Sequence, residues 1–429
     1  MISLPNRPSL WRHRDFMKLW TGQTISELGS RITREGLPLA AVLTLGATPI
    51  QMGWLAAIGS LPVLLVGLFA GAWVDRLHRR PILILADLGR FLLLLTIPLA
   101  AILGALNMVQ LYVVIALAGI LSVLFDVAYA AYLPSLVGRE YIVEGNQKLA
   151  LSSSTAEVLG PGLAGFLVQL VTAPLAILLD ALSFLVSAIS VGFIRKSEPP
   201  APPPHARQPI GREIMEGLRV GLGHPVLRAL VGTESTSAFF GNFFGTLYSL
   251  YAIRELGLGA AALGVTITFG GMGDLAGAFL ASRLPRRLRL GNILIGSLVF
   301  KSAASMLIPI AGGPPWMAMV MLMMAQLFGD GARMVYDIHA VSLRQTITPD
   351  RLLGRVNASL QFIIAGIGPM GALLGGLLAE TLGIRPTLAI AVLGGLFAVA
   401  WLVLSPIRKM VELPPPIATP AFDSTPDNA

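Results

Sequence analysis

Charged side chains interrupt several of the long apolar stretches of this chain of 429 residues. At about 100° per residue, the charged residues near position 30 fall on one helical stripe, which comprises Gln23, Glu27, Arg31, Arg34 and Glu35. Glu27 with Arg31, and Arg31 with Glu35, have the i, i+4 spacing of helical ion pairs. An ionised group in an apolar span is costly unless it is paired or hydrated. The stripe therefore either faces a polar cavity or is a self-neutralised network that holds its helix in place.

Two further carboxylates, Glu157 and Glu234, lie in apolar stretches with no cation one helical turn away. Desolvation favours the protonated form of such a carboxyl group, which suits proton binding and release. We therefore expect Glu27, Glu157 and Glu234 to be the residues that couple transport to protons. The residues expected to face the same cavity and contact a cargo are Gln23, Arg31, Arg34, Ser237, Tyr248 and Asp274.

Other charges within the apolar stretches repeat between the two halves of the chain. The offset from Arg90 to Lys301, and from Asp126 to Asp337, is 211 residues in both cases. This repetition favours a structural role, in which each basic residue pairs with its acidic partner and braces one half, with substrate contact as the alternative. The expected structural charge network comprises Arg90, Asp126, Lys301, Asp330, Arg333 and Asp337.

The elements that must position these groups are predicted to be membrane-spanning helices. The chain is 55% hydrophobic and only 13% charged, whereas soluble proteins are about 25% charged. Continuous apolar runs of the roughly 20 residues that cross a bilayer recur along it, without the alternation typical of a membrane barrel. Asp87 and Asp180 lie near the ends of such runs and are interpreted as hydrated. The twelve expected spans are approximately 17–45, 50–73, 81–104, 109–133, 147–170, 174–194, 226–252, 262–283, 290–311, 315–338, 356–380 and 386–405.

Lysine and arginine mark one side of the predicted spans. Of the 31 Lys and Arg residues, most lie in alternate loops on that side, and only Arg254 and Arg385 lie in loops on the other. The positive-inside rule therefore predicts that both termini are cytoplasmic. The net charge of +8 is interpreted as this topology signal and not as a nucleic-acid footprint. No signal peptide is expected, because no cleavage motif follows the first apolar run.

The region 195–225 divides the spans into two sets of six. Five prolines between 199 and 204 break the hydrophobic pattern there, and a short amphipathic helix follows them. Two parallel six-helix repeats are the arrangement of secondary transporters that rock around a midplane site. The expected segments are a cytoplasmic N-terminal segment (1–16), an N-terminal bundle (17–194), a Pro-rich linker (195–225), a C-terminal bundle (226–405) and a Pro-rich cytoplasmic tail (406–429).

Three sequence motifs resemble those of the major facilitator superfamily. Residues 71–80, Gly-Ala-Trp-Val-Asp-Arg-Leu-His-Arg-Arg, resemble its signature Gly-x-x-x-Asp-Arg-x-Gly-Arg-Arg, with His78 in place of the second glycine. Residues 341–359 look like loop 10–11 of the branch that contains macrolide-efflux proteins and the enterobactin exporter, and residues 86–90 and 125–129 are similar to that branch too. Residues 160–165, Gly-Pro-Gly-Leu-Ala-Gly, resemble the antiporter motif.

The resemblance implies an all-α fold of twelve transmembrane helices in two pseudo-symmetric six-helix bundles. It also implies export of small, often amphipathic molecules driven by proton entry. A cytoplasmic gate, formed as a charge latch, is expected from Gly71, Asp75, Arg76, Arg79 and Arg80. A bend with thin packing on the fifth helix is expected from Gly160, Pro161 and Gly165.

The expected function is a secondary active transporter of the bacterial inner membrane that exports drugs or secreted metabolites by alternating access and proton antiport. A siderophore exporter or lysophospholipid flippase of the same fold is an alternative, and a transport-inactive membrane sensor is an alternative from another class. With no catalytic or nucleotide-binding signature, no cysteine and five scattered histidines, we expect no enzyme, cofactor or metal site. The expected partners are the cargo, protons and the lipid bilayer, with no nucleic acid, and a monomer suffices.

Overall fold

The computed structural model describes residues 10–74, 77–196, 215, 219 and 221–414, which form helices and connecting turns with no β-strand. Each of the twelve spans expected from the sequence coincides with a long helix. The first six helices are α1 (Arg14–Leu39, continued by the π-helical turn η2, Ala40–Thr44), α2 (Pro49–Val74), α3 (Arg79–Ile102), α4 (Met108–Val137), α5 (Ile142–Val171) and α6 (Ala173–Gly192). The second six are α8 (Pro225–Arg254), α9 (Ala260–Ala281), α10 (Leu290–Ser305, continued by α11, Leu307–Ile310), α12 (Pro315–Ile347), α13 (Asp350–Leu382) and α14 (Ile384–Val403).

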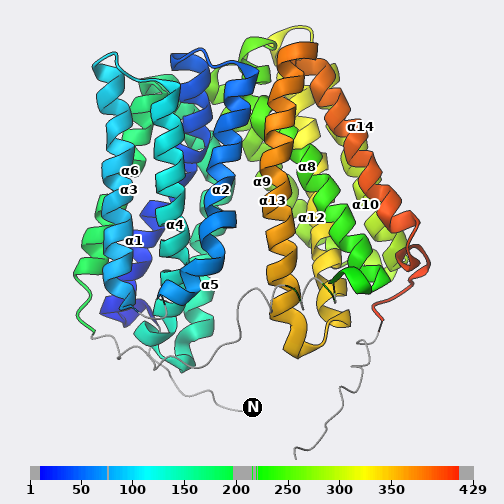
Figure 1. The fold of residues 1–429 in the computed structure, drawn as a ribbon, viewed down its shortest axis with the longest axis horizontal. Coiled ribbons are helices and arrows are strands. Elements are labelled where there is room, and N and C mark those ends of the chain that lie inside the picture. Colours follow the sequence, from blue (N-terminus) through cyan, green and yellow to red (C-terminus); the bar gives the residue numbers. More distant parts are fainter. Residues whose placement is uncertain (1–9, 75–76, 197–214, 216–218, 220, 415–429) are drawn as a thin grey trace, which may run out of the picture.

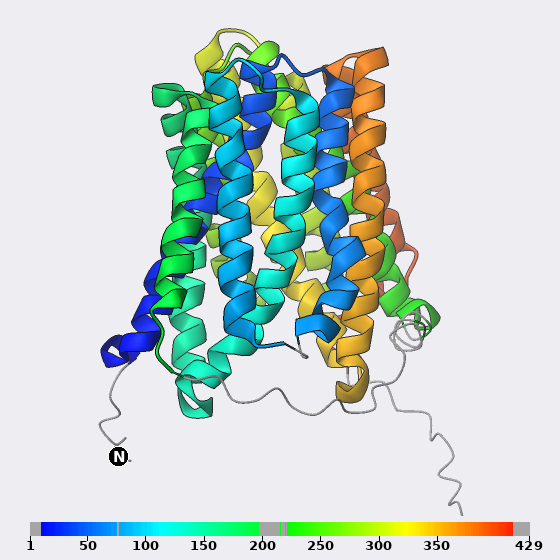
Figure 2. The same cartoon turned by 60° about the vertical axis from the view of Figure 1, so that its left-hand side comes forward.

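The helices form two six-helix bundles that pack alike (Figure 1, Figure 2). In the first bundle α1 packs against α5 and α6, and α3 packs against α4 and α6. In the second bundle α8 packs against α13 and α14, and α10 packs against α12 and α14. The second set of contacts repeats the first with each helix replaced by its counterpart, which is the pseudo-symmetric arrangement expected from the sequence.

The turns between helices repeat at the offset of 211 residues that also relates the charged residues of the two halves. The turn after η2 uses Gly46 at φ 63°, and the turn after α8 uses Gly257 at φ 65°. The turn after α5 uses Thr172 at φ 92°, and its counterpart after α13 uses Gly383 at φ 93°. Positive φ is strained for residues other than glycine. The backbone therefore keeps the repeat even at Thr172, where the residue is threonine and not glycine.

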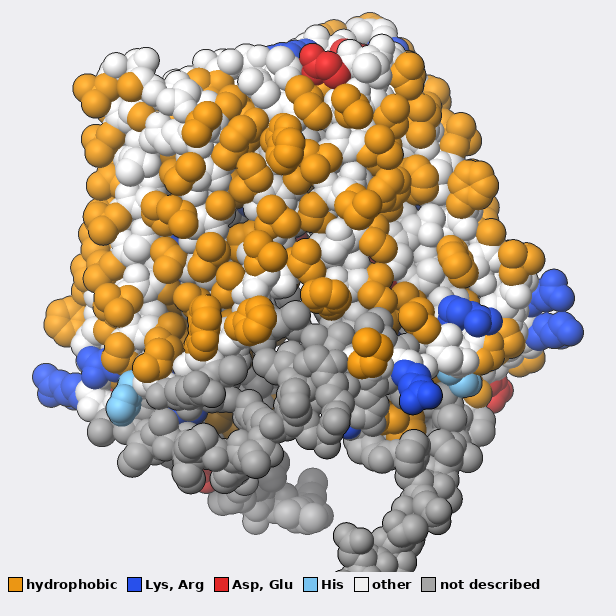
Figure 3. All heavy atoms as spheres, in the orientation of Figure 1, with side chains coloured by type: hydrophobic (Ala, Val, Ile, Leu, Met, Phe, Trp, Pro, Cys, Tyr) orange, Lys and Arg blue, Asp and Glu red, His pale blue; other side chains and the backbone are white. Residues whose placement is uncertain are grey.

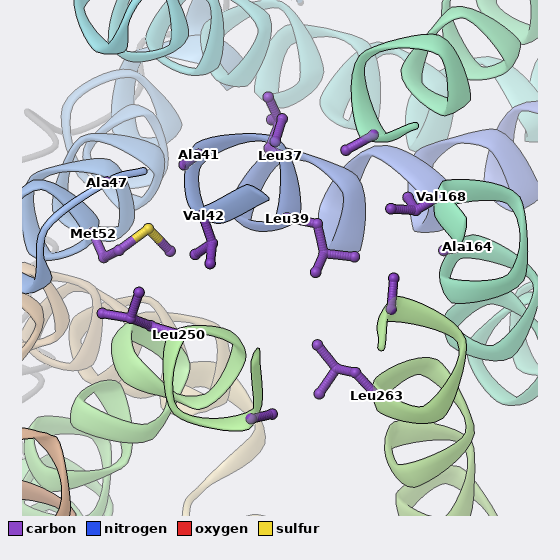
Figure 4. Close-up of a cluster of buried hydrophobic side chains, with 14 of the residues drawn as sticks. Leu37, Leu39, Ala41, Val42, Ala47, Met52, Ala164, Val168, Leu250 and Leu263 are labelled. Carbon is purple, nitrogen blue, oxygen red and sulfur yellow. The ribbon is translucent and has the colours of Figure 1, made fainter. Parts of the chain in front are cut away.

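One hydrophobic core spans both bundles at the end of the molecule that lies opposite the N-terminal end of α1 (Figure 4). Leu37, Val42 and Met52 of the first bundle belong to the same buried cluster as Leu250 and Leu263 of the second. At the other end, each bundle has its own core. The cluster around Phe16 and Tyr132 contains residues of the first bundle alone, and the cluster around Leu227 and Leu402 contains residues of the second alone. Among the described residues, a buried apolar cluster shared by both bundles is therefore found only at the end opposite the start of α1, which faces outward if the termini are cytoplasmic.

Two helix crossings bring the backbones of the bundles together. A Cβ atom placed on Gly53 of α2 would lie 3.3 Å from Cα of Gly376 on α13. A Cβ atom placed on Gly165 of α5 would lie 2.9 Å from Cα of Gly264 on α9. Small residues allow such close approach of membrane helices. The offset of 211 residues relates Gly53 to Gly264 and Gly165 to Gly376, so the two crossings are pseudo-symmetry mates.

Apolar side chains cover the flank of the helices seen in Figure 3, with Lys and Arg near its lower edge. Among the described residues, nine helices are long and apolar enough to cross a membrane. The other three long helices, α1, α8 and α12, carry several of the charges that the sequence places inside spans. These three helices also line the cavity described next.

Candidate transport cavity

A cavity of about 720 Å³ lies between the bundles, midway along the helices. Residues of α1, α2, α4, α8, α9, α10, α12 and α14 line it. Its charged lining residues are Arg34, Glu35, Lys301, Asp330 and Arg333. Its apolar lining includes Met52, Leu55, Phe240, Phe244 and Ile267, and its polar lining includes Ser237, Asn242, Tyr248 and Gln326. The cavity thus offers rings, aliphatic chains and both signs of charge.

Arg31 of α1 pairs with Glu157 of α5. The expected pairs of Arg31 with Glu27 and Glu35 along α1 are wrong. Glu157 has no cation one turn away on its own helix, as expected, but it pairs with Arg31 on another helix. Arg31 can reach Glu157 because of Gly160, which lies one turn further along α5. A Cβ atom there would lie 2.8 Å from Cγ of Arg31, so the missing side chain leaves room for Arg31 against α5.

The two glutamates of α1 that flank Arg31 have no such partner. Glu27 and Glu35 are both half-buried, and neither forms an ion pair within 4.0 Å among the described residues. Glu35 lines the cavity beside Arg34. Glu27 lies within electrostatic range of Asp126 and Tyr129 on α4. The sequence placed Glu35 on the charged stripe that either faces a polar cavity or is a self-neutralised network, but did not name it as a proton-coupling residue.

Glu234 of α8 faces Arg344 of α12, whose Nη1 lies 3.4 Å from both carboxylate oxygens. The side chains are 20% and 11% exposed. The sequence placed Arg344 in a loop and left Glu234 unpaired, which is wrong because α12 continues to Ile347, beyond its expected end at residue 338. The extra turns bring Arg344 beside α8.

Arg333 binds three carboxylates from two helices. Its Nη2 lies 3.0 Å from both oxygens of Asp274 on α9. Its Nη1 lies 3.0 Å from Asp337, and its Nε lies 3.4 Å from Asp330. The expected helical spacing of Asp330, Arg333 and Asp337 therefore does produce contacts. Asp274, expected to contact a cargo, lies outside the cavity lining and is bound to Arg333 instead.

The expected Arg90–Asp126 and Lys301–Asp337 ion pairs are not formed. Arg90 pairs with Asp87 on its own helix, one turn away. Asp126 is exposed, and Lys301 lines the cavity with no ion pair among the described residues. In each bundle another residue occupies one member of the expected pair. Asp87 binds Arg90 in place of Asp126, and Arg333 binds Asp337 in place of Lys301.

Three polar residues expected in hydrated surroundings are buried within the first bundle. Asp87 and Asp180 are 0% and 1% exposed, which corrects their interpretation as hydrated groups near helix ends. Gln23, expected to line the cavity, donates from Nε2 to Ser187 Oγ at 3.0 Å, between α1 and α6. Glycines on the α6-facing side of α1 bring these helices close enough for the contact.

Two of the motifs of the family resemblance, residues 71–80 and 160–165, are placed as follows. Gly71 lies near the end of α2, Arg79 begins α3, and Asp75 and Arg76 lie outside the described residues. Arg80 donates to the carbonyl oxygens of Val191 at 3.2 Å and Gly192 at 2.5 Å, where a cation complements the carboxyl end of α6. In the motif on α5, Gly160 packs against the side chain of Arg31, and Pro161 lies inside the helix. Gly165 lies where α5 crosses α9.

Of the residues expected in the cavity, Arg34, Ser237 and Tyr248 line it, whereas Gln23, Arg31 and Asp274 are not among its lining residues. Sequence reasoning placed Glu35 on the charged stripe but did not name it among the cargo or proton-coupling residues. It missed the cavity-facing position of Lys301, which was assigned to a structural pair by the repeat. The polar character of both residues in apolar spans was the signal that could have identified them.

Known proteins resemble the chain over most of its length. The family model of the transmembrane secretion effector matches residues 8–419. The multidrug efflux pump Tap of Mycolicibacterium fortuitum is 26% identical over 373 residues, covering 84% of this chain and 88% of the pump. The enterobactin exporter EntS of Citrobacter koseri is 26% identical over 360 residues, covering 82% of each chain.

A bacterial homologue of the iron transporter ferroportin has a similar fold. Its inward-facing structure superposes with a TM-score of 0.71 at 18% identity, covering 92% of this chain and 98% of that one. Its outward-facing structure gives a TM-score of 0.56, covering 91% and 98%. The helices therefore superpose better on the inward-facing structure of that homologue than on its outward-facing structure, and both superpositions show the same fold.

Proposed function

Because the chain belongs to the transmembrane secretion effector family of major facilitator transporters, we propose that it exports small amphipathic molecules, drugs or secreted metabolites, by alternating access in exchange for protons. The observation that carries this proposal is the position of the cavity. It lies at the midplane, between two bundles whose apolar cores merge only at the outer end. A cargo would enter from the cytoplasmic side, and rocking of the bundles would release it outside.

The lining supports an amphipathic cargo. Phe240, Phe244 and Tyr248 lie along α8, and Met52 and Leu55 face the same cavity from α2. Rings and flexible apolar chains accommodate varied hydrophobic groups, and a few polar groups fix orientation. The names of the two relatives, a multidrug efflux pump and an enterobactin exporter, agree with cargo of this kind.

We assign the proton that drives export first to Glu35. It is the cavity-lining carboxylate without an ion pair among the described residues, so a proton or a cationic cargo can neutralise it. Glu27 shares this lack of an ion pair but is not among the lining residues. Glu157 and Glu234 remain candidates of another kind, because each would have to exchange its arginine partner for a proton.

Transport into everted membrane vesicles tests the proposal. Vesicles that contain the protein should accumulate a cationic dye such as ethidium when their lumen is acidified. Glu35→Gln should abolish the uptake driven by the pH gradient, while Glu234→Gln and Glu157→Gln should reduce it if their proton exchange contributes. Glu255→Gln is the matched control, because Glu255 pairs with Arg385 at 3.1 Å at the outer surface and should leave uptake unchanged.

Two outcomes would count against the proposal. Uptake at the wild-type rate in every carboxylate variant would refute the proton assignments. Thermal stabilisation of the purified protein by lysophospholipid, with no response to ethidium or to a panel of drugs, would favour a lipid flippase instead.

A further inference from the structure

A cluster of charges inside the first bundle lies outside the cavity. Asp87 and Arg90 of α3 and Asp180 of α6 are 0%, 6% and 1% exposed. None of the three lines the cavity. They lie where α3 and α6 pack against each other, and α6 also packs against α1. The cluster therefore contains two carboxyl groups and one guanidinium, all shielded from water.

The guanidinium of Arg90 is already engaged. It pairs with Asp87, and its Nη1 donates to Ser122 Oγ at 3.3 Å. Its Cζ lies 4.4 Å and 4.1 Å from the ring centroids of Phe125 and Phe184, so aromatic rings occupy the space around it. Asp180 forms no ion pair with Arg90 within 4.0 Å. Asp180 Oδ1 instead accepts a hydrogen bond from Ser183 Oγ at 3.0 Å.

No second cation is available to Asp180 from the described helices around it. On α1 the positions facing α6 include Gly22, Gly29 and Gly36, and a Cβ atom on Gly29 would lie 2.6 Å from Asp180 Oδ1. The charges on α3 near Asp180 are those of Asp87 and Arg90. On α5, which also packs against α6, the charges are taken up by the pairs Glu157–Arg31 and Glu144–Lys148, and η2 carries no ionisable residue.

We propose that Asp87 and Asp180 share one proton, so that the junction of α1, α3 and α6 is a proton-binding site separate from the cavity. Two ionised carboxylates on one guanidinium would leave a net negative charge in an apolar interior, and such a charge is far more costly than a neutral carboxyl group. One bound proton balances the cluster. This inference goes beyond the proposed function, because the proton is bound whether or not the chain transports a cargo.

Infrared spectroscopy of the purified protein tests the shared proton. The wild type at neutral pH should absorb at the C=O stretching frequency of a protonated carboxyl group. Asp180→Asn and Asp87→Asn should each remove the same band, equal to one carboxyl group, because the remaining aspartate is then balanced by Arg90. Arg90→Gln should instead increase the band by one carboxyl group. Glu255→Gln, which removes an exposed carboxylate, should leave it unchanged.

Persistence of the full band in both aspartate variants, or its absence from the wild type, would overturn the proposal. Thermal melting provides a second measurement that does not depend on the spectra. Asp180→Asn has nearly the shape and the zero charge of a protonated aspartate, so its melting temperature at neutral pH should stay near that of the wild type. Failure of this variant to fold would contradict a protonated Asp180.

Discussion

Arg333 shows how one side chain can hold several charges inside a membrane bundle. The planar guanidinium presents five N–H donors in fixed directions, and three of its nitrogens face three different aspartates. Asp274 comes from α9, whereas Asp330 and Asp337 come from α12. Arg333 therefore fastens these two helices beside the cavity that it also lines.

Replacing Arg333 by glutamine should destabilise the protein more than an equivalent surface change. The substitution leaves three carboxylates close together without their cation. Arg385→Gln breaks a single ion pair with Glu255 and should cost only about 0–1 kcal/mol. Arg333→Lys should restore stability only in part, because an ammonium cannot match the fork of the guanidinium. Thermal melting of the four purified proteins measures the order, and equal melting temperatures for the two glutamine variants would contradict it.

The partner of each intramembrane charge could not be predicted from the sequence. Helical spacing identifies neighbours on the same helix, so it produced the contacts of Arg333 with Asp330 and Asp337. It failed for Arg31 and Glu234, whose partners Glu157 and Arg344 lie on other helices. The direction of the Arg31 side chain decides the first pair, and the length of α12 decides the second. Both depend on how the helices pack in three dimensions, which helical spacing does not describe.

At the scale of elements, close backbone crossings join the two bundles. The pair α2–α13 meets at Gly53 and Gly376, and the pair α5–α9 meets at Gly165 and Gly264. The glycines of the antiporter-like motif therefore have distinct tasks in the structure. Gly160 makes room for Arg31, whereas Gly165 lets the two bundles touch.

Adding a methyl group at Gly165 should weaken closure of the outer gate. Overpacking of a close contact costs about 1–3 kcal/mol, so access from outside should rise about fivefold or more. The chain has no cysteine, so a single Ser249→Cys reports on the cavity without background. A membrane-impermeant maleimide added outside should label this cysteine faster when Gly165→Ala is also present.

Two comparisons make this labelling experiment specific. Gly53→Ala, at the symmetry-related crossing, should have a similar effect. Gly67→Ala lies on the same helix as Gly53 but meets no atom within 4 Å, so it should label like the parent protein. Equal labelling rates for Gly165→Ala and Gly67→Ala would show that the crossing does not hold the gate shut.

At the scale of the whole molecule, the sequence predicted the architecture well. Apolar length identified each span, and the offset of 211 residues identified the repeat, because both follow from the thickness of the bilayer and from the duplicated sequence. The end of the molecule at which the two bundles share one apolar core could not be predicted in this way. It depends on which apolar surfaces meet, and Leu37 and Leu263 have no sequence feature that marks them as partners.

The central claim, that cargo leaves the cytoplasm as protons enter it, is tested most directly by measuring both fluxes together. Everted vesicles with an acidic lumen and a lumenal pH dye correspond to cells with an acidic exterior. Addition of ethidium outside should accelerate the loss of the pH gradient in vesicles with the wild-type protein, but not in vesicles with Glu35→Gln. Ethidium uptake that leaves the gradient unchanged, or that continues equally without a gradient, would contradict the account.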